Sequence, residues 1–207
     1  MKNTLISIFF ALLLACYFPE IASAQSNDSI MVTSGATTEP ATDGWVSLQG
    51  DSITILYLPD ANIRKLEARL RTRDVPISQE YRMLLSNGSL SMEDRLKARI
   101  EIILLRVKDI LGMDPKDFHV KVRIFKSRQD MNDAYAWMFN ESANFKSFYI
   151  HHFESIYTNE QDFLDSVMAH ELGHAVIDHY FSVPPPSRMA ELMAIYVDSN
   201  LDQELSN

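Results

Sequence analysis

The feature that most constrains the fold of this 207-residue chain is a pair of histidines four positions apart, His170 and His174. They belong to the pentapeptide His-Glu-Leu-Gly-His. Four residues of an α-helix advance about 400°, so the two imidazoles lie roughly 40° apart on one face, one turn from each other. Both rings can then bind one metal ion, as in hydrolytic zinc sites. Glu171 lies at the flank of that site, where its carboxylate can accept a proton from a metal-activated water.

The residues around this motif predict that it lies on a buried amphipathic helix. Between positions 161 and 181 there is no proline, and Gly173 is the single glycine. Apolar residues recur at helical spacing on both sides of the motif, at Phe163, Leu164, Val167, Met168, Leu172, Ala175 and Val176. The alternative is a helix that carries two histidines at this spacing by accident.

A catalytic zinc ion usually has three protein ligands and one water, so a third ligand is needed. A third histidine six residues after His174 is excluded because Tyr180 stands there. Asp178 shares the face of His174, but three ligands along one straight helix span about 12 Å, too far for metal bonds of about 2 Å. Glu191, on the next predicted helix, is therefore the predicted third ligand. Its alternative role is that of a carboxylate stabilised by a helix N-terminus.

The amino terminus has the pattern of a secretory signal peptide. Lys2 precedes an apolar run from Ile6 to Phe18, and Ala22-Ser23-Ala24 matches a signal-peptidase site. We therefore expect residues 1–24 to be removed and the protein to be periplasmic or secreted. The alternative is a lipoprotein anchored through Cys16, which follows Leu-Leu-Ala. No later run approaches the 18 to 20 apolar residues of a membrane span, so none is expected in the mature chain.

Composition excludes several other classes. Cys16 is the single cysteine, so the mature chain has no disulfide and no thiolate ligand. The net charge is −9, and the nearest approach to a basic cluster, between Arg64 and Arg73, is interrupted by Glu67 on a predicted helix. A solvated helix face explains this cluster, and nucleic acid is a poor candidate partner.

The pattern along the chain predicts one α+β domain. Residues 25–44 are small and polar and are expected to form a flexible leader, and the domain is expected over residues 45–207. Strands are predicted at 53–58, at 119–125 with one buried and one wet face, and at 146–157 as a hairpin bent around His151-His152. Residues 76–90 are ambiguous, with a turn at Asn87-Gly88.

Capping signals delimit the predicted helices. Asp60 is expected to cap a helix over residues 61–73. Ser91 opens a long helix that Gly112 ends. Ser127 and Asp130 have the spacing of a capping box. The motif helix and a last helix over residues 187–201 follow, separated by three prolines.

Together these residues resemble the gluzincin metallopeptidases, and more narrowly the small exported bacterial proteins of peptidase MA-like type. The resemblance rests on His-Glu-x-x-His-Ala, the proline-rich turn, and Glu-Leu-x-Ala-x-Tyr-Val from Glu191, with a looser likeness around Val122. It implies a zincin-like fold, in which a small mixed sheet packs on the active-site helix and a ligand-bearing helix follows. It also implies a zinc peptidase acting on peptides or proteins, with His170, His174 and Glu191 as ligands and Glu171 as general base. In such enzymes an edge strand, here near Tyr149 and Tyr157, pairs with extended substrate.

One departure from that family affects the support of the ligands. The acid that thermolysin-like members place four residues after the glutamate ligand is Ile195 here. The role of orienting a histidine is either vacant here or taken by Asp178 or Asp198. Candidate oxyanion donors are His179, Tyr180, Tyr157 and Tyr196, and the adjacent His151 and His152 are expected at the surface. An inactive zincin-fold binding module in the cell envelope is the alternative function.

Overall fold

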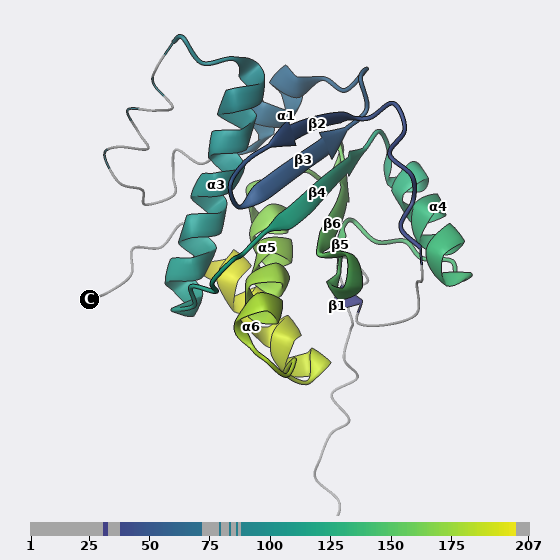
Figure 1. The fold of residues 1–207 in the computed structure, drawn as a ribbon, viewed down its shortest axis with the longest axis vertical. Helices are drawn as coiled ribbons and strands as arrows, with labels where there is room; N and C mark the ends of the chain where they lie inside the picture. Colours follow the sequence, from purple (N-terminus) through teal and green to yellow (C-terminus); the bar gives the residue numbers. More distant parts are fainter. Residues whose placement is uncertain are drawn as a thin grey trace, which may run out of the picture.

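The computed structural model of the protein describes residues 31–32, 38–71, 79, 83, 86 and 88–201. The signal peptide expected over residues 1–24, with Cys16, lies outside the described residues, as does most of the ambiguous segment 76–90. The described chain forms one small mixed α/β domain built around a six-stranded mixed sheet (Figure 1). The predicted combination of a mixed sheet and flanking helices is thus confirmed.

The sheet has the strand order β1-β5-β6-β4-β3-β2. Its strands are β1 (Met31–Val32), β2 (Val46–Gln49), β3 (Ile53–Tyr57), β4 (Val120–Phe125), β5 (Phe148–Ile150) and β6 (Ser155–Asn159). Strands β3, β4 and β6 are parallel, β2 and β5 are antiparallel to their neighbours β3 and β6, and β1 runs parallel to β5. A 3-10 turn, His151–Phe153, joins β5 to β6, which confirms the predicted hairpin.

Helices cover both faces of this sheet. They are α1 (Ile63–Arg69), α3 (Met92–Leu111), α4 (Arg128–Phe139), α5 (Asp165–Tyr180) and α6 (Ser187–Asn200). The larger core joins the sheet to α1, α3, α5 and α6, whereas α4 covers the opposite face with a smaller, aromatic core (Figure 1). Among the described residues, no helix has the length and apolar character needed to cross a membrane.

Capping signals were predicted at Asp60, Ser91, Gly112 and Ser127, and the last three are confirmed. Ser91 accepts a hydrogen bond from the Asp94 amide, and Gly112 ends the same helix with a φ of 63°. The capping box of Ser127 and Asp130 is present at α4. The prediction that Asp60 caps a helix over 61–73 is wrong, because Asp60 lies in a turn and pairs with Lys126.

The cap of α1 is Asn62 instead, and the helix ends early. The Asn62 side chain accepts a hydrogen bond from the Lys65 amide, so the helix begins three residues after the Asp60 position. Leu70 is extended and 1% exposed. Its packing into the core stops the helix well before residue 73.

The prediction that β4 has one wet face is also wrong. β4 lies between the parallel strands β3 and β6, and Arg123 on its supposedly wet side is only 4% exposed. A strand buried on both faces is normal for a parallel sheet. Two ion pairs of 2.8 Å join Arg123 and Lys121 to Glu39. Part of the segment expected to be a flexible leader therefore covers this face, and another part forms β1.

Candidate metal centre

The site is built where α5 and α6 pack closely together. Ala190 and Ala194 of α6 are fully buried. A Cβ atom placed on Gly173 would lie 3.5 Å from the Cα of Ala194, so the two backbones approach as near as a van der Waals contact allows. Small residues at this crossing bring Glu191, one turn into α6, to the histidines of α5.

His170, His174 and Glu191, together called the triad below, converge as predicted. The Nε2 atoms of the two histidines lie 3.2 Å apart. The carboxylate of Glu191 faces both, with Oε1 at 3.5 Å from His170 Nε2 and Oε2 at 3.3 Å from His174 Nε2. His174 is fully buried and the Glu191 side chain is 35% exposed, so solvent reaches the group from the α6 side.

These separations fit a tetrahedral zinc ion. Bonds of about 2.0–2.1 Å at tetrahedral angles place neighbouring ligand atoms about 3.3 Å apart. The two Nε2 atoms lie 3.2 Å apart, close to that edge length, and each oxygen of Glu191 lies 3.3 to 3.5 Å from a different one of them. With one ligand atom taken from each residue, the three atoms lie within 4.8 Å of one another. Two imidazole nitrogens and one carboxylate oxygen are also the donors that catalytic zinc sites use, with a fourth position left for water. The residues present fit the group.

Asp198 is the acid that orients a histidine. Its Oδ2 lies 3.1 Å from His170 Nδ1 and so holds the proton there, which leaves the Nε2 lone pair directed at the triad. Asp198 follows Glu191 by seven residues, about two helical turns, and therefore lies on the same face of α6. The Nδ1 of His174 is buried and has no hydrogen-bond partner among the described residues.

Asp178, the other candidate for that role, has different partners. It accepts a 2.6 Å hydrogen bond from the Tyr149 hydroxyl and forms an ion pair with His151. Burial and the neighbouring Asp178 charge raise the pKa of Tyr149, so this hydroxyl stays protonated as the donor. Asp178 therefore links β5 and the following turn to α5. The His151 side chain is 43% exposed and His152 is exposed, so both lie at the surface as predicted.

The charges at the triad reinforce one another. Burial by itself would lower the pKa of His170, but the hydrogen bond to Asp198 and the charges of Glu171 and Glu191 raise it overall. Burial would likewise raise the pKa of Glu191, but the hydrogen bond and charges of the two histidines lower it overall. The carboxylates of Asp198, Glu171 and Glu191 thus surround His170 with negative charge.

Glu171, the predicted general base, is fully buried and held by a residue that sequence reasoning missed. The hydroxyl of Ser147 donates a 2.6 Å hydrogen bond to Glu171 Oε1. Ser147 immediately precedes β5 and is itself fully buried. It is 24 positions away in the sequence, and no spacing pattern connects it to the motif.

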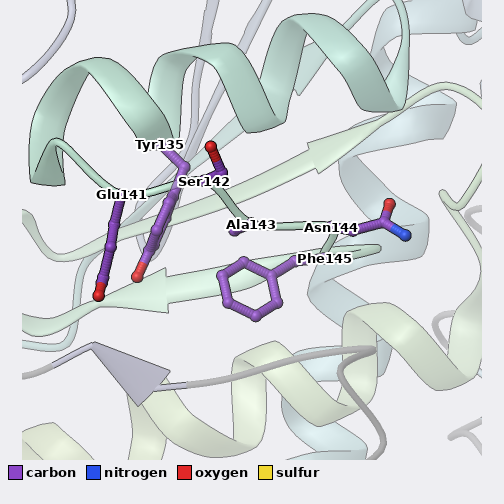
Figure 2. A pocket seen from close by; sticks show the side chains of 6 residues that line it. All are labelled: Tyr135, Glu141, Ser142, Ala143, Asn144 and Phe145. Atoms are coloured by element: carbon purple, nitrogen blue, oxygen red, sulfur yellow. The ribbon is translucent and has the colours of Figure 1, made fainter.

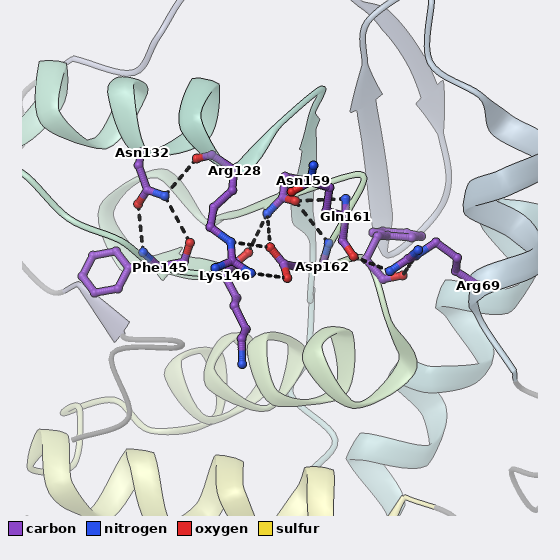
Figure 3. A network of polar contacts seen from close by, with 9 residues as sticks. Arg69, Arg128, Asn132, Phe145, Lys146, Asn159, Gln161 and Asp162 are labelled. Atoms are coloured by element: carbon purple, nitrogen blue, oxygen red, sulfur yellow. Dashed lines mark hydrogen bonds and ion pairs between the residues drawn. The ribbon is translucent and has the colours of Figure 1, made fainter. Parts of the chain in front are cut away.

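A polar network fixes the segment that carries Ser147 (Figure 3). Arg128 binds the Asp162 carboxylate with two hydrogen bonds of 2.8 and 2.6 Å. Asn159 donates both to Asp162 and to the backbone carbonyl of Lys146, the residue before Ser147. Asn132 exchanges two hydrogen bonds with the backbone of Phe145. The chain on the N-terminal side of Ser147 is therefore tied to α4 and to the end of β6.

Two of the four candidate oxyanion donors are engaged elsewhere. The Tyr157 hydroxyl donates to Glu39 on the opposite face of the sheet. His179 Nδ1 hydrogen-bonds the Ala175 carbonyl. Tyr180 and Tyr196 are about half exposed and have no contact with the triad among the described interactions.

A separate pocket lies beside the end of α4 (Figure 2). Its lining comes from Tyr135 on α4 and from the loop that follows, namely Glu141, Ser142, Ala143, Asn144 and Phe145. None of the triad residues lines it. The chemistry of the donor set therefore locates the candidate site better than the shape of the surface does.

Comparisons with known proteins return no match. No protein-family model matches the chain, and neither a curated protein nor a solved structure matches it.

Proposed function

We propose that the protein is an exported zinc-dependent peptidase with a zincin-like fold, in which His170, His174 and Glu191 hold one zinc ion. The observation that carries the proposal is the convergence of their side chains: the two Nε2 atoms lie 3.2 Å apart, and each oxygen of Glu191 lies 3.3 to 3.5 Å from a different one of them. The adjacent Glu171, on the same helix, supplies the base that hydrolysis requires. The packing of α5 against the sheet and of α6 against α5 supports the zincin-like assignment.

Zinc bound in such a site lowers the pKa of water toward about 7 and polarises a carbonyl group. Glu171 accepts the proton of the attacking water and delivers it to the departing amine. Ser147 holds one oxygen of Glu171, which leaves the carboxylate in a fixed orientation for both transfers. Asp198 keeps His170 in the tautomer that presents Nε2 to the ion.

A peptide-library assay tests this function. The zinc-loaded protein is incubated with a mixed peptide library, and new termini are identified by mass spectrometry. We expect cleavage by the native protein and by the control Glu154→Gln, an exposed residue, but none by Glu171→Gln with zinc still bound. Cleavage by Glu171→Gln would refute the role of the base. A native protein that binds zinc and peptides without cleaving them would be the binding module instead.

A further inference from the structure

The edge of the sheet nearest the candidate site is covered by the chain's own N-terminal segment. β1 is a two-residue strand, and it pairs in parallel with β5 in the register Met31 to Tyr149 and Val32 to Ile150. Among the strands that the structure describes, it is the last on that side of the sheet. Without it, those backbone N–H and C=O groups of β5 that point away from β6 would face outward, as on any open edge strand.

This edge borders the residues that would carry out hydrolysis. β5 begins directly after Ser147, whose hydroxyl binds Glu171, and Tyr149 of β5 binds Asp178 near the end of the motif helix. β5 therefore lies along α5. β1 also lies against α6, the helix that carries Glu191. β1 thus contacts both β5, which lies along the motif helix α5, and α6, which carries Glu191.

The same N-terminal segment is anchored a few residues later. Glu39 forms ion pairs with Arg123 and Lys121 and accepts hydrogen bonds from the hydroxyls of Ser155 and Tyr157. The Pro40 carbonyl accepts a further hydrogen bond from Arg123. Burial would raise the pKa of Glu39, but these partners lower it overall, so the anchor is a carboxylate. An anchored segment has a high effective concentration at the neighbouring edge.

We propose that Met31–Val32 occupies, in the same molecule, the strand edge of β5 to which an extended peptide substrate binds. The N-terminal segment is then an intramolecular competitor of substrate, and this inference rests on the proposed peptidase function. A two-residue ladder offers few hydrogen bonds, so an extended peptide that pairs along more of the edge displaces it. Main-chain pairing gives such a site affinity for extended peptides of varied sequence.

The test uses full-length protein in the Glu171→Gln background, so that a bound peptide is not consumed. The probe is a fluorescein-labelled peptide with the chain's own sequence from Asn27 to Thr37. The variant is Met31→Pro/Val32→Pro, which removes both backbone N–H donors of β1. Met31→Ala/Val32→Ala, which keeps those donors, is the matched control. We expect the proline variant to bind the peptide at least tenfold more tightly than the parent or the alanine control.

Hydrogen exchange supplies the second readout. Neighbouring amides of a strand point to opposite edges, so only one of Tyr149 and Ile150 faces β1. In the proline variant that amide should exchange faster, and added peptide should protect it again. In the parent protein, saturating peptide should expose whichever amide of Met31 and Val32 faces β5, while the β5 amides stay protected. The measurement on the parent protein needs no substitution in β1, so it tests the displacement of β1 even where the proline variant does not fold. Unchanged exchange of that β1 amide at saturating peptide would overturn the proposal.

Turnover measurements separate this inference from the proposed function. With Glu171 restored, the proline variant should show a KM at least tenfold lower than the alanine control. Active enzyme with the same KM in both variants would overturn the inference and leave the peptidase function standing. Peptide exchange at β5 in a protein without zinc or turnover would overturn the peptidase function and, with it, the description of this edge as a substrate site.

Discussion

Asp198 and His170 form the contact that sets the chemistry of the candidate site, with 3.1 Å between Oδ2 of the acid and Nδ1 of the ring. His170 belongs to α5 and Asp198 to α6, the two helices that carry the triad. Asp198 lies two helical turns after Glu191. A proton held on Nδ1 leaves Nε2 as the only lone pair of the ring, and that atom faces His174 and Glu191. A residue of α6 therefore fixes the orientation of the His170 ring on α5.

Removing this acid should weaken zinc binding without removing a ligand. For Asp198→Ala we expect a 10- to 100-fold higher dissociation constant for zinc, because acids that hydrogen-bond a ligating histidine typically contribute that much. Competition with a chromogenic chelator measures it. Asp178→Ala is the control, since Asp178 binds Tyr149 and not the triad. Equal effects of the two substitutions would contradict the assignment.

The contact between Ser147 and Glu171 predicts a loss of turnover with zinc retained. Ser147→Ala removes a buried hydrogen bond of about 1–2 kcal/mol, so we expect kcat to fall by roughly tenfold. Zinc stoichiometry should stay the same because Ser147 does not contact the triad. Steady-state kinetics on a peptide cleaved by the native protein provide the measurement. Ser142→Ala, in the preceding loop and exposed, should retain full turnover.

The network around Asp162 predicts a loss of stability in acid. Burial would raise the pKa of Asp162, but the hydrogen bonds from Arg128 and Asn159 lower it overall, below the ordinary value of 3.8. Its stabilising contribution is therefore complete above about pH 4 and lost as the pH falls through the lower, folded-state value. Asp162→Asn should cost about 1–3 kcal/mol at pH 7, and the difference should shrink below pH 4.

Urea unfolding of native protein and Asp162→Asn across this pH range measures the effect. The exposed Asp133→Asn on α4 is the control and should remain within about 0.5 kcal/mol of native protein at every pH. A constant difference between Asp162→Asn and native protein from pH 7 to pH 2.5 would show that the Asp162 carboxylate is not held in its charged form by Arg128.

The close crossing of α5 and α6 predicts that a larger residue at Ala194 disturbs the site. Ala194 is fully buried against Gly173, so Ala194→Leu should cost about 1–3 kcal/mol through overpacking. The displaced helix should also weaken zinc binding, because Glu191 lies on it. Thermal unfolding and chelator competition check both effects. Leu192→Ala, on the exposed side of α6, should change neither.

Local signals in the sequence predicted most of the elements and the triad. The caps at Ser91 and Ser127 and the spacing of His170 and His174 act within a few residues, and the structure has them as expected. The pattern points to Glu191 because Tyr180 stands where a third histidine would be and Asp178 lies too far along the same helix. The choice between Asp178 and Asp198 needed the structure, although the seven-residue spacing from Glu191 points to Asp198.

Contacts between distant segments could not be predicted. Glu39 neutralises Arg123 from 84 positions away, so the alternation of β4 wrongly indicated a solvent face. Ser147 reaches Glu171 only because β5 lies along α5. β1 lies in a stretch of small polar residues that has no strand pattern, and the pairing depends on the open edge of β5.

The most direct test of the account is a zinc titration of native protein beside Glu191→Ala. By isothermal titration calorimetry we expect one zinc ion per native chain, and at least a hundredfold weaker binding after loss of the third ligand. The exposed Glu154→Ala should bind zinc like native protein. A native chain that takes up no zinc, or a Glu191→Ala variant that binds it as tightly, would contradict the proposed metal centre.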